Sequence, residues 1–322
     1  MTLHGAMASA NNAHTLRTLD VEEIFVTHAK RLRDLIAAPQ MLVAPGAYDG
    51  LTARLIAQAQ FSCVYMTGAG TSCAYGYPDY GLLTMSEMVD NAGRIADAAD
   101  VPVIADADNG YGNELNVYRT IRAYEKAGIA GVHLEDQVLP KRCGHLDDKE
   151  LISEADYLAK IRAAADARRD QNFVIIARTD SRATLGLQAA ADRCNAALEA
   201  GADVAFLEAP QTMEEVAAVP SMVCGPCLMN VVRNGKTPEV TFTQAASMGY
   251  ALAIVPGLLF IQTMGACQQA LAQMRAEDKH PQPLADLSPA QAFAIAGADA
   301  WEPRRHIYKT SPASAAPAQA AE

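Results

Sequence analysis

Short apolar runs recur along this chain, and a segment with helical periodicity follows most of them. The runs begin at residues 41, 61, 101, 131, 173, 202, 226 and 250. Each run is too short for a helix and too continuously apolar for a strand with one face in water. We therefore predict eight buried parallel strands, because strands covered on both faces read as continuous hydrophobic segments.

The segments between these runs repeat their apolar residues with the period of an α-helix. The clearest examples are residues 85–100, 115–128, 154–169 and 187–201. Thr84 and Ser153 stand where helix N-caps are expected. Several of these segments end in Ala-Gly just before the next apolar run, and glycine suits the position that follows a helix.

Strands that alternate with helices over about 250 residues predict an α/β fold, the (β/α)8 barrel of the TIM type. The alternative is an open doubly wound sheet, but no GxGxxG motif follows the first apolar run. We expect one barrel domain over residues 21–310. It would lie between a flexible N-terminal extension, 1–20, and a disordered tail, 311–322, that is rich in alanine and proline.

Polar residues gather at the carboxyl ends of consecutive predicted strands. They are Asp106, Asp108, Glu135, Asp136, Arg178, Glu208 and Asn230. Barrel enzymes build their active sites at this end of the strands. The pattern therefore predicts an active site, although polar residues at the start of solvated loops would be a simpler explanation.

Asp106 and Asp108 are two residues apart on a segment that we predict to be extended, so their side chains would point the same way. Two like charges held together are costly unless a cation lies between them. With Glu135 and Glu208 nearby, all the ligands would be oxygens, which suits Mg²⁺ or Mn²⁺ better than zinc. The alternative is a pair of aspartates in a turn after a strand.

Cys143 lies in the segment LPKRCGHLDD, close to Lys141, Arg142 and His145. A cysteine packed in a core gains nothing from basic neighbours, whereas positive charge favours the thiolate of a cysteine that transfers a proton. The pair Cys224-Gly-Pro-Cys227 matches a redox motif. It precedes a predicted strand instead of opening a helix, so we predict no redox role for it.

Composition narrows the possible partners. The formal net charge of −11 over 322 residues argues against nucleic acid. Seven scattered cysteines are not a disulfide framework, and no apolar run approaches the ~20 residues of a membrane span. The N-terminus lacks the hydrophobic segment of a signal peptide. We expect a cytoplasmic protein with no membrane partner.

The motifs Asp106-Ala-Asp108, Glu135-Asp136-Gln137 and Lys141-Arg-Cys-Gly-His145, in this order, resemble the isocitrate lyase/phosphoenolpyruvate mutase superfamily. The likeness extends from about residue 40 to 275 and is nearest to its short members. These are 2-methylisocitrate lyase, 2,3-dimethylmalate lyase and oxaloacetate acetylhydrolase. The resemblance implies the same barrel, in a homotetramer whose last helix is exchanged between subunits.

The resemblance also implies roles for individual residues. Asp106 and Asp108 would hold Mg²⁺ (or Mn²⁺), with Glu135 in the outer shell. Cys143 would donate the catalytic proton, and the base would be Tyr65 or a carboxylate near the metal. Arg178 would grip a substrate carboxylate, and the remaining substrate-binding residues would be Thr67, Gly68, Ala69, Asp79, Gly144, His145, Glu208 and Asn230.

The implied reaction is cleavage of the C2–C3 bond of a 2-hydroxy-dicarboxylate such as 2,3-dimethylmalate, giving pyruvate and propionate. The alternatives are cleavage of the tricarboxylate 2-methylisocitrate to pyruvate and succinate, hydrolysis or decarboxylation of oxaloacetate, and a barrel without activity. Pro256 matches the lyases. Ile261 falls where methylisocitrate lyases carry an arginine, which favours the dicarboxylate, although Arg304 or Arg305 would be alternative partners for a third carboxylate.

Overall fold

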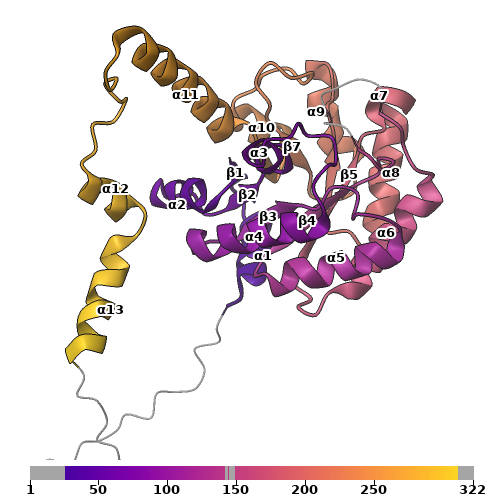
Figure 1. Ribbon diagram of the computed structural model, residues 1–322. Coiled ribbons are helices and arrows are strands. Elements are labelled where there is room, and N and C mark those ends of the chain that lie inside the picture. Colours follow the sequence, from indigo (N-terminus) through magenta and orange to yellow (C-terminus); the bar gives the residue numbers. More distant parts are fainter. Residues whose placement is uncertain (1–25, 142–143, 145–148, 311–322) are drawn as a thin grey trace, which may run out of the picture.

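The computed structural model describes residues 26–141, 144 and 149–310 (Figure 1). The whole N-terminal extension, 1–20, and the whole C-terminal tail, 311–322, that the sequence predicts therefore lie outside the described residues, as do Cys143 and His145. Their roles stay predictions.

The eight predicted strands all form, and they make one parallel sheet. They are β1 (Leu42–Ala47), β2 (Val64–Met66), β3 (Val103–Asp106), β4 (Gly131–Glu135), β5 (Val174–Thr179), β6 (Val204–Leu207), β7 (Leu228–Asn230) and β8 (Leu252–Val255). The order is β6-β5-β4-β3-β2-β1-β8-β7. A parallel bridge between Ala205 and Cys227 joins the two ends. The predicted (β/α)8 barrel is confirmed.

Helices surround the sheet. They are α1 (His28–Ala37), α2 (Gly50–Gln58), α3 (Gly68–Ala74), α4 (Met85–Ala99), α5 (Glu114–Lys126), α6 (Glu154–Ala167), α7 (Arg182–Leu185), α8 (Leu187–Glu199), α9 (Met213–Met222) and α10 (Phe242–Met248). The predicted caps are confirmed, because the side chains of Thr84 and Ser153 accept hydrogen bonds from the first turns of α4 and α6. Gly128 and Gly201 follow α5 and α8 with φ of 85° and 114°, a conformation that favours glycine.

The alternation of side chains along each strand explains why the polar residues converge. On β5, Val174 and Ile176 pack in the barrel interior, whereas Ile175 and Ala177 pack against the surrounding helices. Arg178 is the next inward position. The same alternation turns one residue inward at the carboxyl end of other strands: Tyr65, Asp106, Glu135, Glu208 and Asn230.

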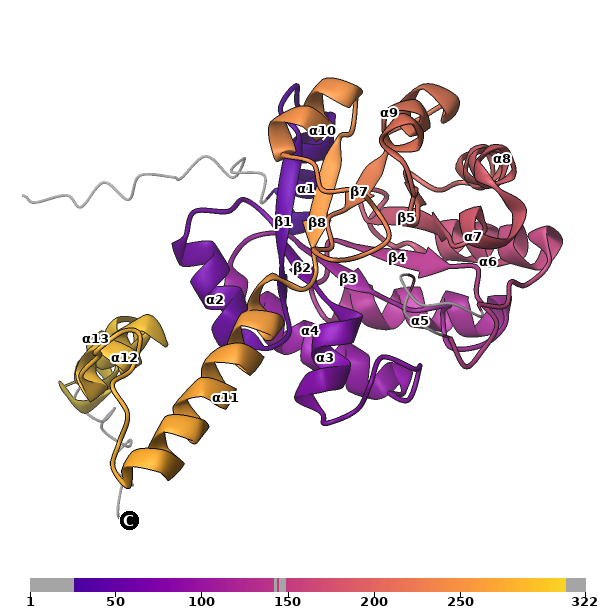
Figure 2. The same cartoon turned by 90° about the horizontal axis from the view of Figure 1, so that it is seen from above.

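The C-terminal helices leave the barrel. Figures 1 and 2 show α11 (Leu258–Glu277) leading away from it to α12 (Pro289–Ile295) and α13 (Ala298–Thr310). α11 has no buried residue. The segment returns to the barrel at α2, where the Gln58 side chain donates a hydrogen bond of 2.9 Å to the Ile295 carbonyl. Within the described residues, no helix has both the length and the apolar character that crossing a membrane requires.

Candidate active site

Nine of the predicted site residues line one pocket at the carboxyl ends of the strands, whereas Asp108 and Glu135 are not among its described lining residues. Its polar lining is Tyr65, Thr67, Asp79, Asp106, Arg178, Glu208 and Asn230, and its remaining lining is Ala69, Gly144, Val232, Ile254, Pro256, Gly257, Phe260 and Ile261. Gly68 lies beside the pocket, where a Cβ atom would collide with the Asp106 carboxylate. To these predicted residues the structure adds an apolar wall that leads from β8 into α11.

The loop after β3 differs from the extended segment that the sequence predicted. Asp108 has φ of 45°, so strand alternation does not apply to it. The prediction of an extended segment at this residue is wrong, because the chain turns as soon as β3 ends. The turn folds the Asp108 backbone N–H onto Asp106 Oδ1, at 2.9 Å.

Buried side chains hold the backbone of this loop. The hydroxyl of Tyr124 donates to the Asp106 carbonyl at 2.9 Å, and the ammonium of Lys160 donates to the Asn109 carbonyl at 3.0 Å. Thr120 donates to the Gly110 carbonyl at 3.2 Å. These three bonds come from helices α5 and α6, so the barrel wall fixes the loop that carries both aspartates.

Lys141 is buried between carboxylates. Its ammonium lies 2.5 Å from Asp79 Oδ1 and 2.9 Å from Asp108 Oδ1, and its side chain is 3% exposed. Burial disfavours the charged lysine, but Asp108 and Asp79 outweigh burial and raise its pKa well above the usual value. The sequence suggested Lys141 only as a basic neighbour of Cys143; the structure makes it a cation of the carboxylate site.

Burial raises the pKa of two of the predicted metal-binding carboxylates, Asp108 and Glu135. Burial raises the pKa of Asp108 to about 6, with Lys141 opposing the shift. Burial also raises the pKa of Glu135 well above its usual value. Glu135 Oε2 lies 3.2 Å from Arg178 Nη1, whereas Oε1 accepts no hydrogen bond from the residues that the structure describes.

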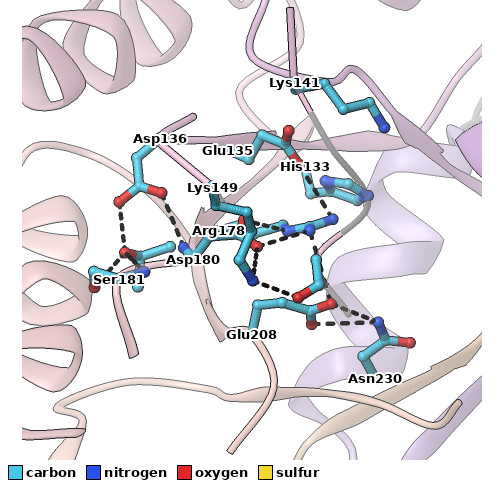
Figure 3. Close-up of polar contacts among 12 residues, drawn as sticks. His133, Glu135, Asp136, Lys141, Lys149, Arg178, Asp180, Ser181, Glu208 and Asn230 are labelled. Carbon is cyan, nitrogen blue, oxygen red and sulfur yellow. Dashed lines mark hydrogen bonds and ion pairs between the residues drawn. The ribbon is translucent and has the colours of Figure 1, made fainter. Parts of the chain in front are cut away.

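Arg178 lies among three buried carboxylates (Figure 3). Asp180 holds it in a bidentate pair, with distances of 3.0 Å from Nε and 3.2 Å from Nη2. Glu135 lies 3.2 Å from Nη1, and Glu208 lies 3.7 Å from Nη2. Asn230 donates to both oxygens of Glu208, at 3.1 and 3.2 Å. The guanidinium is therefore fixed before any substrate binds, which suits it to recognise a carboxylate.

The hydroxyl of Tyr65 is in hydrogen-bonding contact with a buried histidine, His133. The Tyr65 hydroxyl is 2.8 Å from His133 Nε2 and 3.4 Å from Asp106 Oδ2. Burial, with the charge of Arg178, lowers the pKa of His133 to about 3, so the imidazole is neutral at pH 7. Burial and Asp106 raise the pKa of Tyr65 well above 10. In this environment Tyr65 is a hydrogen-bond donor and a poor base.

Sequence reasoning missed His133, Asp180 and Lys149. His133 precedes Glu135 by two residues on β4, so strand alternation was an available signal for it. Asp136, which the sequence singled out, faces the other side of the sheet. Its carboxylate accepts a hydrogen bond from Arg193 Nε at 2.9 Å and another from the backbone N–H of Asp180 at 2.9 Å. The second contact holds the backbone of Asp180, whose side chain pairs with Arg178.

The donor set suits a divalent cation. No three His, Cys, Asp or Glu side chains among the described residues are already grouped so that they could hold a metal ion. The site nevertheless holds six buried or half-buried carboxylates and only three cations among these residues: Asp79, Asp106, Asp108, Glu135, Asp180 and Glu208 against Lys141, Lys149 and Arg178. A dianionic substrate would be repelled by this excess. Oxygen donors, with one carboxylate oxygen of Glu135 unpartnered, fit Mg²⁺ or Mn²⁺.

A parallel barrel with fixed arginine and carboxylate side chains at the carboxyl ends of its strands is the architecture of a (β/α)8 barrel enzyme. A family model described as phosphoenolpyruvate phosphomutase matches residues 32–275. The chain belongs to the phosphoenolpyruvate mutase/isocitrate lyase superfamily, as its motifs predicted.

Similar proteins include several lyases. The chain is 48% identical to 2,3-dimethylmalate lyase of Eubacterium barkeri over 229 residues, which cover 71% of this chain and 79% of that protein. It is 41% identical to 2-methylisocitrate lyase of Aeropyrum pernix over 243 residues, 76% of this chain and 78% of that protein.

Solved structures agree with this assignment. The structure of oxaloacetate acetylhydrolase with 3,3-difluorooxalacetate has a TM-score of 0.84 and 38% identity, and the match covers 88% of this chain and 98% of that one. Phosphonopyruvate hydrolase in complex with oxalate and Mg²⁺ has a TM-score of 0.79 and 29% identity, over 88% of this chain and 99% of that one.

Proposed function

We propose that this chain, a carbon–carbon lyase by its family and relatives, cleaves the C2–C3 bond of a 2-hydroxy-dicarboxylate of the 2,3-dimethylmalate type. The observation that carries the proposal is the composition of the pocket. Arg178 is the only arginine among its described lining residues, and the wall formed by Val232, Pro256, Phe260 and Ile261 is apolar. One fixed guanidinium suits one substrate carboxylate, and an apolar wall suits the methyl groups of an alkylated malate.

Arg304 and Arg305 do not supply a further cation within the same chain. Arg304 stacks on Trp301 at 5.6 Å, and Arg305 lies 3.5 Å from Glu302, all on α13. A third carboxylate, as in 2-methylisocitrate, would therefore meet Ile261 and its apolar neighbours. This arrangement supports the dicarboxylate over the tricarboxylate.

A metal ion is part of the proposal. When bound by Asp106 and Asp108, with Glu135 in the outer shell, Mg²⁺ or Mn²⁺ would act as a Lewis acid toward the substrate oxygens. The complex of phosphonopyruvate hydrolase with oxalate and Mg²⁺ supports this assignment. Those three carboxylates come from the carboxyl ends of β3 and β4 and from the loop after β3.

The chain's own residues would carry the proton transfers. Arg178 would orient one carboxylate, while the Tyr65 hydroxyl would donate a hydrogen bond to a substrate oxygen. The raised pKa of Tyr65 favours the second candidate for the base, a carboxylate near the metal, which would take the proton of the 2-hydroxyl. The C2–C3 electron pair would then move toward C3 and its carboxylate, and the Cys143 thiol would protonate C3.

A substrate panel with Mg²⁺ tests this proposal. We expect the highest kcat/KM for 2,3-dimethylmalate, with pyruvate and propionate as products, and lower values for 2-methylisocitrate and oxaloacetate. Preference for 2-methylisocitrate, or turnover of oxaloacetate alone, would reject the proposed substrate while leaving the family unchanged.

We also propose that the protein is a homotetramer in which α11 packs on a neighbouring subunit. α11 exposes Met264, Leu271 and Met274 to water in the single chain. A long helix with no buried residue gains little stability by itself, so an apolar surface of this extent favours a protein partner.

A further inference from the structure

Lys149 is a buried lysine beside the active site that neither the motifs nor the proposed reaction uses. Its side chain is 2% exposed, and its ammonium lies 3.2 Å from Asp180 Oδ1. It also donates a hydrogen bond to the carbonyl of Gly144. Burying an ammonium is costly unless the charge is paired and hydrogen-bonded, so these two contacts determine where Lys149 can lie.

Asp180 connects Lys149 to the substrate-binding arginine. The Asp180 carboxylate accepts hydrogen bonds from Lys149 and from two nitrogens of Arg178. The Asp180 backbone N–H donates a hydrogen bond to the Asp136 carboxylate (Figure 3). Asp180 is fully buried. These contacts hold the Asp180 side chain in place. The Lys149 ammonium and the Arg178 guanidinium, which both bind it, therefore have fixed positions relative to each other.

Gly144 lies on the other side of Lys149, against the same arginine. A Cβ atom on Gly144 would collide with Arg178 Nη2 and with the Glu208 carboxylate. The Gly144 peptide therefore lies directly on the Arg178–Glu208 pair, and Gly144 lines the pocket. Lys149 thus contacts the two groups, Asp180 and the Gly144 carbonyl, that flank Arg178.

We propose that Lys149 is a positioning residue for the lyase reaction, whose ammonium holds the Gly144 peptide against Arg178 by bridging the Gly144 carbonyl to Asp180. A lysine suits this place because its compact ammonium has three donors that can point in different directions. The chain of contacts runs from Gly144 through Lys149 and Asp180 to Arg178. A second interpretation is that Lys149 only neutralises the buried charge of Asp180, and the experiment separates the two.

The first measurement does not depend on turnover. Hydrogen exchange at the Gly144 amide, followed by mass spectrometry, reports whether the Gly144 peptide is held against Arg178. We expect Lys149→Met to speed this exchange at least tenfold in the full-length protein. The matched control is Arg168→Met, which removes a cation from an ion pair with Asp203 at 2.8 Å, at the opposite end of the barrel. It should lower Tm but leave this exchange unchanged.

The second measurement is kcat, and it rests on the proposed function. Asp180→Asn removes the charge that a counter-ion would neutralise but keeps an Oδ1 acceptor for Lys149, so the bridge from that acceptor to the Gly144 carbonyl is still available in that background. We expect the double variant Lys149→Met/Asp180→Asn to have a kcat at least tenfold below that of Asp180→Asn alone. Its Tm should be close to that of the single variant.

Two results would overturn the proposal. One is exchange at the Gly144 amide in Lys149→Met that equals that of the wild type. The other is equal kcat in the double variant and in Asp180→Asn, which would make Lys149 a counter-ion only. If no substrate in the panel is turned over, the proposed function fails, and the exchange measurement still decides the role of Lys149.

Discussion

The ammonium of Lys141 lies 2.9 Å from Asp108 Oδ1, inside the carboxylate site that the sequence assigned to a metal ion. It also touches Asp79, so one lysine balances two acidic residues that come from separate loops. Neighbouring ionised carboxylates need a cation between them. The structure satisfies part of this need with the chain's own lysine, although burial still raises the pKa of Asp108 to about 6. Lys141 and a divalent ion would therefore act on the same carboxylates.

Chelation should abolish turnover. Exhaustive treatment with EDTA removes the ion that would polarise the substrate oxygens, and Mg²⁺ or Mn²⁺ added back should restore kcat. The measurement is steady-state turnover of 2,3-dimethylmalate, with Ca²⁺ in place of Mg²⁺ as a comparison. Full activity after chelation would show that Asp106 and Asp108 serve a purpose other than metal binding.

Lys141→Met should tighten metal binding. The substitution removes a positive charge that competes for Asp108, and a charge-assisted contact of this kind is worth roughly 1.5–3 kcal/mol, about one to two decades in affinity. Titration of the protein with Mn²⁺, followed by electron paramagnetic resonance, measures the Kd. Lys126→Met makes the same change in net charge at an exposed position on α5 and should leave Kd unchanged. Weaker binding in Lys141→Met would mean that the lysine organises the site for the ion.

Cys143→Ala should lower kcat by about two orders of magnitude or more, because a positioned proton donor contributes on the order of 10²–10⁴-fold. Its Tm should stay near that of the wild type. Cys224→Ala, at an exposed cysteine, is the control and should retain full activity. If Cys224→Ala were the damaging change, the interpretation of the segment around Cys143 would be wrong.

The alternation of side chains along buried strands made both the strands and most of the pocket residues predictable from the sequence. A buried strand alternates inward and outward positions, so the polar residue that ends an apolar run, such as Arg178 after Ile176, projects into the barrel mouth. The prediction of no redox role for Cys224 and Cys227 rests on a different ground, because the pair precedes a strand and does not open a helix. Cys227 directly precedes β7 and is buried, and burial raises its pKa to about 12, which disfavours a thiolate.

The parts that sequence could not supply depend on contacts between distant segments. Lysines are solvated in most proteins, so nothing in the order of residues indicates that Lys141 and Lys149 are buried. Their burial is decided by carboxylates 62 and 31 residues away in the chain. The turn at Asp108 is likewise imposed by its surroundings, because φ of 45° is uncommon for aspartate without support from neighbouring groups.

Two glutamates on α11 should break the assembly. Met264 and Leu271 are seven residues apart and share one face of the helix, and both are exposed in the single chain. If a neighbouring subunit covers them, Met264→Glu/Leu271→Glu buries two charges and should convert the tetramer to a smaller species. Light scattering after gel filtration measures the mass. Gln273→Glu, on the opposite face of α11, should leave the mass unchanged; a double variant that remains tetrameric would exclude this face from the interface.

Ile261→Arg should shift specificity toward the tricarboxylate. Ile261 lines the pocket beside Phe260, on the apolar wall that a third carboxylate would have to meet. A guanidinium there would give this carboxylate a charge-assisted partner, worth roughly 1.5–3 kcal/mol or about one to two decades. The ratio of kcat/KM for 2-methylisocitrate to that for 2,3-dimethylmalate should rise by this factor. Ile261→Met keeps the wall apolar and should leave the ratio nearly unchanged. A wild-type enzyme that already prefers 2-methylisocitrate would show that another cation, from outside this pocket, binds the third carboxylate.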